Sequence, residues 1–242
     1  MKQFAILGLG AFGQRMLDEL LGITSEIIII DKDREIIEKY TDMAKAAYIA
    51  DVINETALTK IIPPEIDAVI VDLGGKLESS IMAISYLKKM GIKTIIAKAQ
   101  SDEQGQVLTL VGATRVIFPD LEAAKRITPM LASSLLFNFM PISPKLALAE
   151  IRANEACIGK SIRDANLRQL FGLNILALRK ENDDDFVFIN NPSYVFMEDD
   201  ILLVAGEEEN LLNFSRQLKE LPQPHSAGLF RNLFSSHTKK PV

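Results

Sequence analysis

Three glycines near the start of the chain, Gly8, Gly10 and Gly13, have the spacing G-x-G-x-x-G, which is suited to binding phosphate groups. Gly8 would permit a tight turn, Gly10 would let a pyrophosphate approach the backbone, and Gly13 would let a helix pack close to a sheet. The first N–H groups of that helix would carry a partial positive charge that favours an anion. The spacing therefore predicts binding of a nucleotide through its phosphates, and a plain cluster of turn glycines is the alternative.

An acidic residue follows the glycines at the position where a ribose contact is expected. Asp31 ends the apolar run 27–30, and its carboxylate can accept hydrogen bonds from the ribose hydroxyl groups. The same charge would repel a 2′-phosphate, so NADPH is disfavoured. A solvated charge at the end of a strand is the alternative for Asp31. Because a strand pattern precedes the glycines and a helix pattern follows them, we expect a nucleotide-binding βαβ unit.

Strand and helix patterns alternate through the first 120 residues. This alternation predicts an α/β fold with a doubly wound parallel sheet, which forms a Rossmann-like N-terminal domain over residues 1–120. In such a sheet, ligands bind beyond the carboxyl ends of the strands. The expected strands are 3–8, 27–31, 47–50, 68–73, 94–98 and 115–118, and the expected helices are 12–21, 33–43, 54–61, 77–90 and 102–111.

Apolar residues at helical spacing continue through residues 119–141. Their surface is too apolar to leave in water, so we expect a crossover and dimerisation helix, 121–141, that packs against a second copy of the chain. Packing on its own domain is the alternative. The longest uncharged stretch, 127–144, contains prolines and polar residues, so we do not expect it to span a membrane.

The pattern changes after Pro141 and Pro144 and predicts a small α+β C-terminal domain over residues 142–221. A core of this size is marginal, so pairing with a second copy would help. The run 182–185 predicts a hairpin turn, and the tail, 222–242, is expected to be disordered. The expected strands of this domain are 146–152, 174–180, 186–189 and 201–205, and its expected helical stretches are 161–171 and 207–218.

Composition and missing residue types exclude several classes of function. The formal net charge of -5 argues against binding nucleic acid, and the single cysteine, Cys157, excludes an internal disulfide and fits a reducing cytoplasm. Both histidines, His225 and His237, lie in the tail, and no Tyr-x-x-x-Lys pair is present. The usual acid–base groups of a dehydrogenase are therefore absent, and we expect no enzyme. A small NAD-dependent oxidoreductase that uses a carboxylate as its base is the alternative.

The chain resembles the RCK (KTN) regulatory subunits of bacterial potassium uptake systems, of the TrkA/KtrA type. The resemblance extends to about Leu221. It rests on the glycine motif and Asp31, on Ala50-Asp51, and on the segments 98–100, 112–120, 159–162 and 200–206.

This resemblance implies a cytoplasmic regulatory subunit, peripheral to the inner face of the cell membrane, that gates a membrane-embedded potassium channel or transporter subunit. It implies homodimers that assemble into an octameric ring. An adenine nucleotide, either ATP, ADP or NAD(H), would bias the ring between shapes that favour an open or a closed pore. A nucleotide sensor bound to another kind of transporter is a further alternative.

The resemblance also implies roles for residues of the nucleotide site. Asp31 would hold the adenosine ribose, Asp51 and Val52 would line the adenine site, Gly74 would form the sugar or base wall, and Lys98 would lie near the phosphates. The complete expected set is Gly8, Leu9, Gly10, Ala11, Phe12, Gly13, Asp31, Lys32, Asp51, Val52, Gly74 and Lys98.

Three further positions bear on what the site would bind. Asp120 matches a position where relatives often have a glutamate in a divalent-cation site between subunits. Ala11 stands where several relatives have an arginine that reaches the terminal phosphate, so the preferred nucleotide is left open. Relatives also bind a second effector, such as cyclic di-AMP, in the C-terminal domain. Arg168 is the basic candidate for that effector, and a solvated helix face is its alternative.

Overall fold

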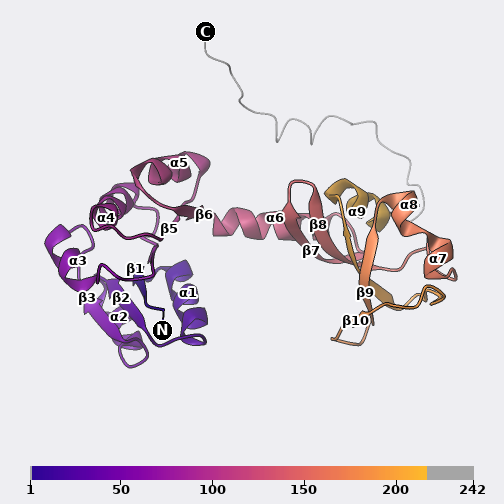
Figure 1. Cartoon of the computed structure of the whole chain (residues 1–242), viewed down its shortest axis with the longest axis horizontal. Coiled ribbons are helices and arrows are strands. Elements are labelled where there is room, and N and C mark those ends of the chain that lie inside the picture. Colours follow the sequence, from indigo (N-terminus) through magenta and orange to yellow (C-terminus); the bar gives the residue numbers. More distant parts are fainter. Residues whose placement is uncertain (1, 217–242) are drawn as a thin grey trace, which may run out of the picture. The chain divides into compact units, whose positions relative to one another are not determined.

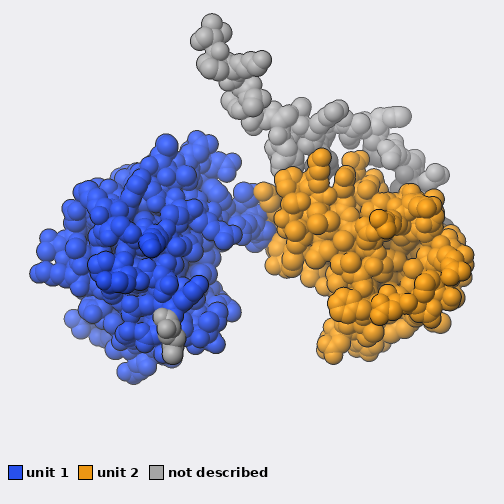
Figure 2. Space-filling model, in the orientation of Figure 1, with its two compact units in different colours: residues 1–123 blue, residues 124–242 orange. Residues whose placement is uncertain are grey.

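The structure is a computed structural model in which residues 2–216 are described. The chain divides into two compact units, residues 1–123 and 124–242, and each has its own sheet (Figures 1 and 2). The expected disordered tail, 222–242, lies outside the described residues. Among the residues that are described, no helix is long and apolar enough to cross a membrane.

Unit 1 contains a six-stranded sheet in the order β3-β2-β1-β4-β5-β6, in which every neighbouring pair is parallel. This arrangement confirms the predicted α/β class and the Rossmann-like N-terminal fold. The strands are β1 (Phe4–Leu7), β2 (Ile27–Asp31), β3 (Ala46–Ile49), β4 (Ala68–Val71), β5 (Ile95–Lys98) and β6 (Arg115–Ile117). The helices between them are α1 (Ala11–Leu21), α2 (Arg34–Tyr40), α3 (Glu55–Ile61), α4 (Leu77–Lys89) and α5 (Asp102–Val111).

The sheet of unit 1 is buried on both faces, which explains its uninterrupted apolar strands. Ile6 packs in one cluster with Leu17 of α1 and Ile37 of α2. Its neighbour Leu7 points the other way and packs in a second cluster with Ile84 of α4. Because both faces are covered, the free rim at the carboxyl ends of the strands is where polar groups can gather.

The predicted crossover helix, 121–141, is wrong in its second half. Helix α6 (Pro119–Leu131) ends ten residues early, and strand β7 (Leu136–Ser143) follows it. Strand β7 pairs with β8 (Leu146–Arg152) at the edge of a second sheet, and an edge strand can accommodate Pro141. Pairing with a neighbouring strand therefore outweighs the helical spacing of the apolar residues.

Unit 2 contains a five-stranded antiparallel sheet in the order β10-β9-β11-β8-β7. This sheet agrees with the predicted small α+β domain, although β7 was not expected. The single expected helix over 161–171 is two short helices, because Asn166 between them has a left-handed backbone with φ of 45°. The remaining elements are α7 (Ile162–Ala165), α8 (Leu167–Phe171), β9 (Asn174–Lys180), β10 (Val187–Phe188), β11 (Asp200–Gly206) and α9 (Glu208–Ser215).

A buried carboxylate joins strands β9 and β11 in unit 2. Asp200 is fully buried, and it accepts hydrogen bonds from the Tyr194 hydroxyl at 2.9 Å and from the Met197 N–H at 2.8 Å. Lys180 Nζ lies 2.9 Å from Asp200 Oδ1 and 2.7 Å from Asp199 Oδ1. The two carboxylates raise the pKa of Lys180 above its ordinary value. This cluster has a structural role, because it joins strands β9 and β11 of the sheet.

Candidate functional site

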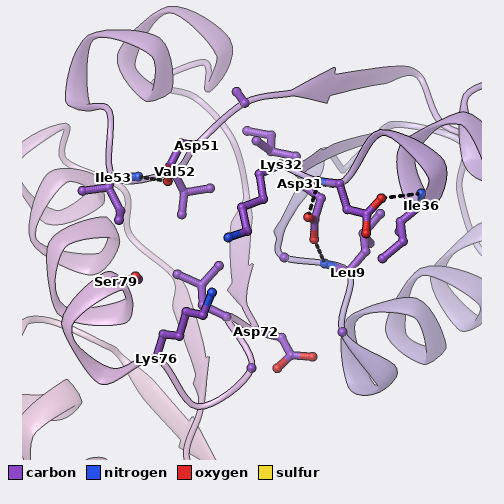
Figure 3. Close-up of a pocket in the computed structure, with 17 residues that line it drawn as sticks. Leu9, Asp31, Lys32, Ile36, Asp51, Val52, Ile53, Asp72, Lys76 and Ser79 are labelled. Atoms are coloured by element: carbon purple, nitrogen blue, oxygen red, sulfur yellow. Dashed lines mark hydrogen bonds between the residues drawn. The ribbon is translucent and has the colours of Figure 1, made fainter.

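A pocket of about 340 Å³ lies at the carboxyl ends of strands β1, β2, β3 and β4 in unit 1 (Figure 3). Its wall includes Gly8 after β1, Asp31 at the end of β2, Asp51 after β3 and Asp72 after β4. The strand order reverses between β1 and β4, and open α/β sheets bind ligands at such a switch point. The volume also lies within the range of small-molecule sites.

The turn after β1 brings three backbones into close contact. Gly8 has φ of +86°, and a Cβ at this position would lie 2.0 Å from the backbone oxygen of Asp72. A Cβ at Gly13 would lie 2.3 Å from the backbone oxygen of Gly8, so helix α1 starts against the turn itself. At both positions only glycine fits the observed backbone.

Gly10 is explained by the protein itself rather than by a ligand. A Cβ at Gly10 would lie 2.8 Å from Asp72 Oδ2. The glycine motif predicts that this position lacks a side chain so that a pyrophosphate can approach the backbone. In the structure, the space next to Gly10 is taken by the carboxylate of Asp72.

Asp31 is held in place by two backbone donors. Its Oδ2 accepts a hydrogen bond from the Leu9 N–H at 2.6 Å, and its Oδ1 accepts one from the Asp33 N–H at 2.9 Å. A carboxylate has about four acceptor positions, so lone pairs remain for a hydroxyl group in the pocket. The arrangement can therefore present a fixed acceptor to a ribose.

The loop after β3 supplies another part of the wall. Asp51 Oδ1 accepts a hydrogen bond from the Ile53 N–H at 3.1 Å, which closes a short turn. Val52 is buried, and Ile53 is partly exposed. With Ile36 of α2, these side chains provide apolar surface against which a planar base could pack.

Asp72 is the main pocket residue that the sequence analysis missed. It is only 2% exposed, and its Oδ2 accepts a hydrogen bond from the Gly13 N–H at 2.9 Å. Its Oδ1 has no hydrogen-bond partner among the described residues, although Lys98 Nζ lies 3.5 Å away. The signal that could have identified it is its position directly after a buried strand, the same position that singled out Asp31.

The cations are placed differently from what the sequence suggested. Lys98, expected near the phosphates, does not line the pocket; its ammonium group lies beside Asp72 and 5.9 Å from the centre of the Phe12 ring. Lys32 and Lys76 do line the pocket and point toward one another (Figure 3). Lys76 directly precedes α4 and was not predicted.

Most of the expected nucleotide-binding residues are brought together by the fold. Those that line the pocket are Gly8, Leu9, Gly10, Asp31, Lys32, Asp51, Val52 and Gly74. Those that do not are Ala11, Phe12, Gly13 and Lys98. Lining residues outside the expected set include Asp33, Asp72, Leu73, Lys76 and Ser79.

Asp120 and Arg168 are both exposed, and neither is among the residues that line this pocket. Asp120 is in the first turn of α6, and Arg168 is on α8. Within residues 2–216 no group of three or more His, Cys, Asp or Glu side chains is arranged to hold a metal ion.

Comparison with known proteins finds one domain family in each part of the chain. Residues 4–119 match the TrkA-N domain, and residues 146–219 match the TrkA-C domain. The GsuK RCK domain has a similar fold, with a TM-score of 0.62 and 17% identity over 92% of this chain and 48% of that chain. The GsuK channel bound to NAD matches with a TM-score of 0.62 and 16% identity, over 92% of this chain and 40% of that chain.

Fold and sequence thus define a protein built from one TrkA-N domain and one TrkA-C domain. Ktr system potassium uptake protein C of Bacillus subtilis (strain 168) is 31% identical over 219 residues, which is 90% of this chain and 97% of that protein. Ktr system potassium uptake protein A of the same organism is 29% identical over 216 residues, 89% of this chain and 96% of that protein. The chain belongs to the family of Ktr potassium uptake proteins.

Proposed function

We propose that this chain is a nucleotide-binding regulatory subunit of a potassium uptake system. The observation that carries the proposal is the pocket at the switch point of the parallel sheet, where the Asp31 carboxylate is fixed by two backbone N–H groups. Membership of the Ktr family supplies the link to potassium. The proposal assigns no catalytic reaction to the chain.

The ligand in this proposal is an adenine nucleotide of the ATP, ADP or NAD(H) kind. Its ribose hydroxyls donate hydrogen bonds to Asp31, and its base packs near Asp51 and Val52, with Gly74 beside the sugar. A divalent cation at Asp120 belongs to the same proposal. It rests on the position of that residue alone.

The assembly in this proposal is a homodimer that forms an octameric ring on the cytoplasmic face of a membrane-embedded potassium channel or transporter subunit. Leu121, Ile127 and Leu131 of α6 are exposed apolar residues, which supports packing of this helix against a second copy. A ligand regulates such a ring only through different affinities for its two shapes. A complete shift from 1:99 to 99:1 needs about 5.5 kcal/mol, which identical sites can share.

The proposed pocket is tested by replacing the ribose acceptor. Asp31→Ala should weaken binding of adenosine-containing ligands about tenfold or more, because a hydrogen bond to a charged group contributes roughly 1.5–3 kcal/mol. Isothermal titration calorimetry with adenosine, AMP, ADP, ATP and NADH measures the loss. Circular dichroism melting of the ligand-free proteins checks that the variant is folded.

The matched control is Asp18→Asn, which removes one exposed negative charge from α1 outside the pocket. Its affinities should equal those of the wild type. Equal affinities for a folded Asp31→Ala variant, or no binding of any of these ligands to the wild type, would contradict the proposed function.

A further inference from the structure

The start of helix α1 already has an anion that belongs to the protein. Helix α1 begins at Ala11, so the Gly13 N–H is one of the first four, which have no partner within the helix. Asp72 Oδ2 accepts that N–H at 2.9 Å. This carboxylate therefore lies where the glycine motif predicted the phosphates of a ligand.

The charge of Asp72 is nearly sealed from water and only partly compensated. Its side chain is 1% exposed, and the nearest cation is Lys98, itself 18% exposed, at 3.5 Å from Oδ1. Within residues 2–216, Oδ1 has no hydrogen-bond partner, although Asp72 lines the pocket. Lys98 thus compensates a carboxylate of the chain, and a phosphate at this place would have to share it.

Helix α1 itself supplies no cation at this end of the pocket. The first turn of α1, from Ala11 to Gln14, contains no basic residue. The ionisable residues in the whole pocket wall are four carboxylates and two ammonium groups: Asp31, Asp33, Asp51, Asp72, Lys32 and Lys76. The wall is therefore net negative, and the repulsion of a phosphate is strongest beside the buried carboxylate of Asp72.

From this geometry we infer that Asp72 is a specificity-determining residue that disfavours pyrophosphate at the start of α1, so that the pocket prefers adenosine and AMP to ADP and ATP. This inference rests on the proposed function, which places an adenosine-containing ligand in the pocket, but it changes the preferred ligand from ATP, ADP or NAD(H) to adenosine or AMP. A pyrophosphate could occupy the start of the helix only by displacing the Asp72 carboxylate or by lying next to it. Adenosine and AMP, which have at most one phosphate, avoid most of the repulsion from the Asp72 carboxylate.

The test compares a charge-graded series of ligands on the wild type and on Asp72→Asn. Asparagine keeps an oxygen that can accept the Gly13 N–H, but it removes the charge and frees Lys98 for a phosphate. Calorimetry with adenosine, AMP, ADP and ATP should show the ADP-to-adenosine affinity ratio rise about tenfold or more, which corresponds to about 1.4 kcal/mol. In the wild type, ADP should bind no more tightly than adenosine.

The matched control is Asp33→Asn, which removes the same charge from the same pocket wall but not from the start of α1. Asp33 caps α2 by accepting the Glu35 N–H at 2.9 Å, and asparagine also caps helices well. This variant should change the ADP-to-adenosine ratio by less than threefold. Asp72→Ser, which keeps an acceptor oxygen, replaces Asp72→Asn if that variant does not fold.

Several results would overturn the inference. The inference fails without any variant if the wild-type protein binds ADP at least tenfold more tightly than adenosine. It also fails if the ADP-to-adenosine affinity ratio is unchanged or lower in the Asp72 variant, or if the ratio rises equally in Asp33→Asn. Adenosine binding by the wild type tests the proposed function separately: if neither the wild type nor the Asp72 variant binds any of these four ligands or NADH, both conclusions fail.

Discussion

Gly8 is the residue on which the shape of the pocket most depends. Its backbone is left-handed, and its Cα approaches β4 so closely that a methyl group would collide with the backbone oxygen of Asp72. Backbone atoms of a central strand cannot move aside as a flexible side chain can. The wall of the pocket therefore requires glycine here whether or not a ligand is bound.

Gly8→Ala should lower the free energy of unfolding by about 3 kcal/mol or more, because left-handed strain and overpacking add. Gly91→Ala is the control: Gly91 has φ of +82°, but a Cβ there meets nothing within 4 Å. That variant should lose only about 1–2 kcal/mol from strain alone. Urea unfolding measures both, and similar losses in the two variants would contradict the close approach at Gly8.

Asp31 and Asp72 show how far the site could be predicted from sequence. Asp31 follows the glycine motif within one βαβ unit, so its role depends on a short, regular spacing. Asp72 is 59 residues away from Gly13, its hydrogen-bond partner, and only the pairing of β1 with β4 brings the two together. A motif read along the chain identifies the start of α1, but it cannot show which side chain from another strand reaches that start.

The helices and strands of unit 1 were predictable because the helices have a clear period and the strands are short apolar runs with clear ends. The strand bounds of unit 1 differ from the predicted ones by one or two residues at most. The segment 119–141 was not predictable in the same way, because Leu136 and Phe139 fit a helical spacing as well as a strand that pairs with β8. Pairing with β8 decides between helix and strand, and the sequence of residues 119–141 alone does not contain that partner.

Asn166 separates helices α7 and α8, which the sequence predicts as one helix over 161–171. A substitution at Asn166 tests this interruption. Its φ of 45° and ψ of 42° end α7 and precede α8. Asn166→Ala should lower the free energy of unfolding by about 1–2 kcal/mol. The left-handed backbone crowds a Cβ, and alanine lacks the polar side chain with which asparagine can form a local hydrogen bond. Asn166→Gly is the control and should be close to neutral. Thermal unfolding checks both; a neutral alanine variant would argue for a continuous helix over 161–171.

The chain has two separate cores, one in each unit. Unit 1 buries both faces of its sheet, and unit 2 packs around Phe139, Phe196 and Phe214. A regulatory subunit needs occupancy of one domain to change how copies of the chain associate. In the proposed function, the pocket supplies the differential binding and the exposed face of α6 belongs to the contacts that respond.

The most direct measurement of the proposed function is potassium uptake into membrane vesicles that contain this chain together with the membrane-embedded potassium transporter subunit that the proposal assigns to it. Adding an adenosine-containing ligand that calorimetry shows to bind should change the uptake rate severalfold, and Asp31→Ala should abolish that change at the same ligand concentration. Asp18→Asn should respond as the wild type does. An uptake rate that is the same with and without bound ligand would contradict the account.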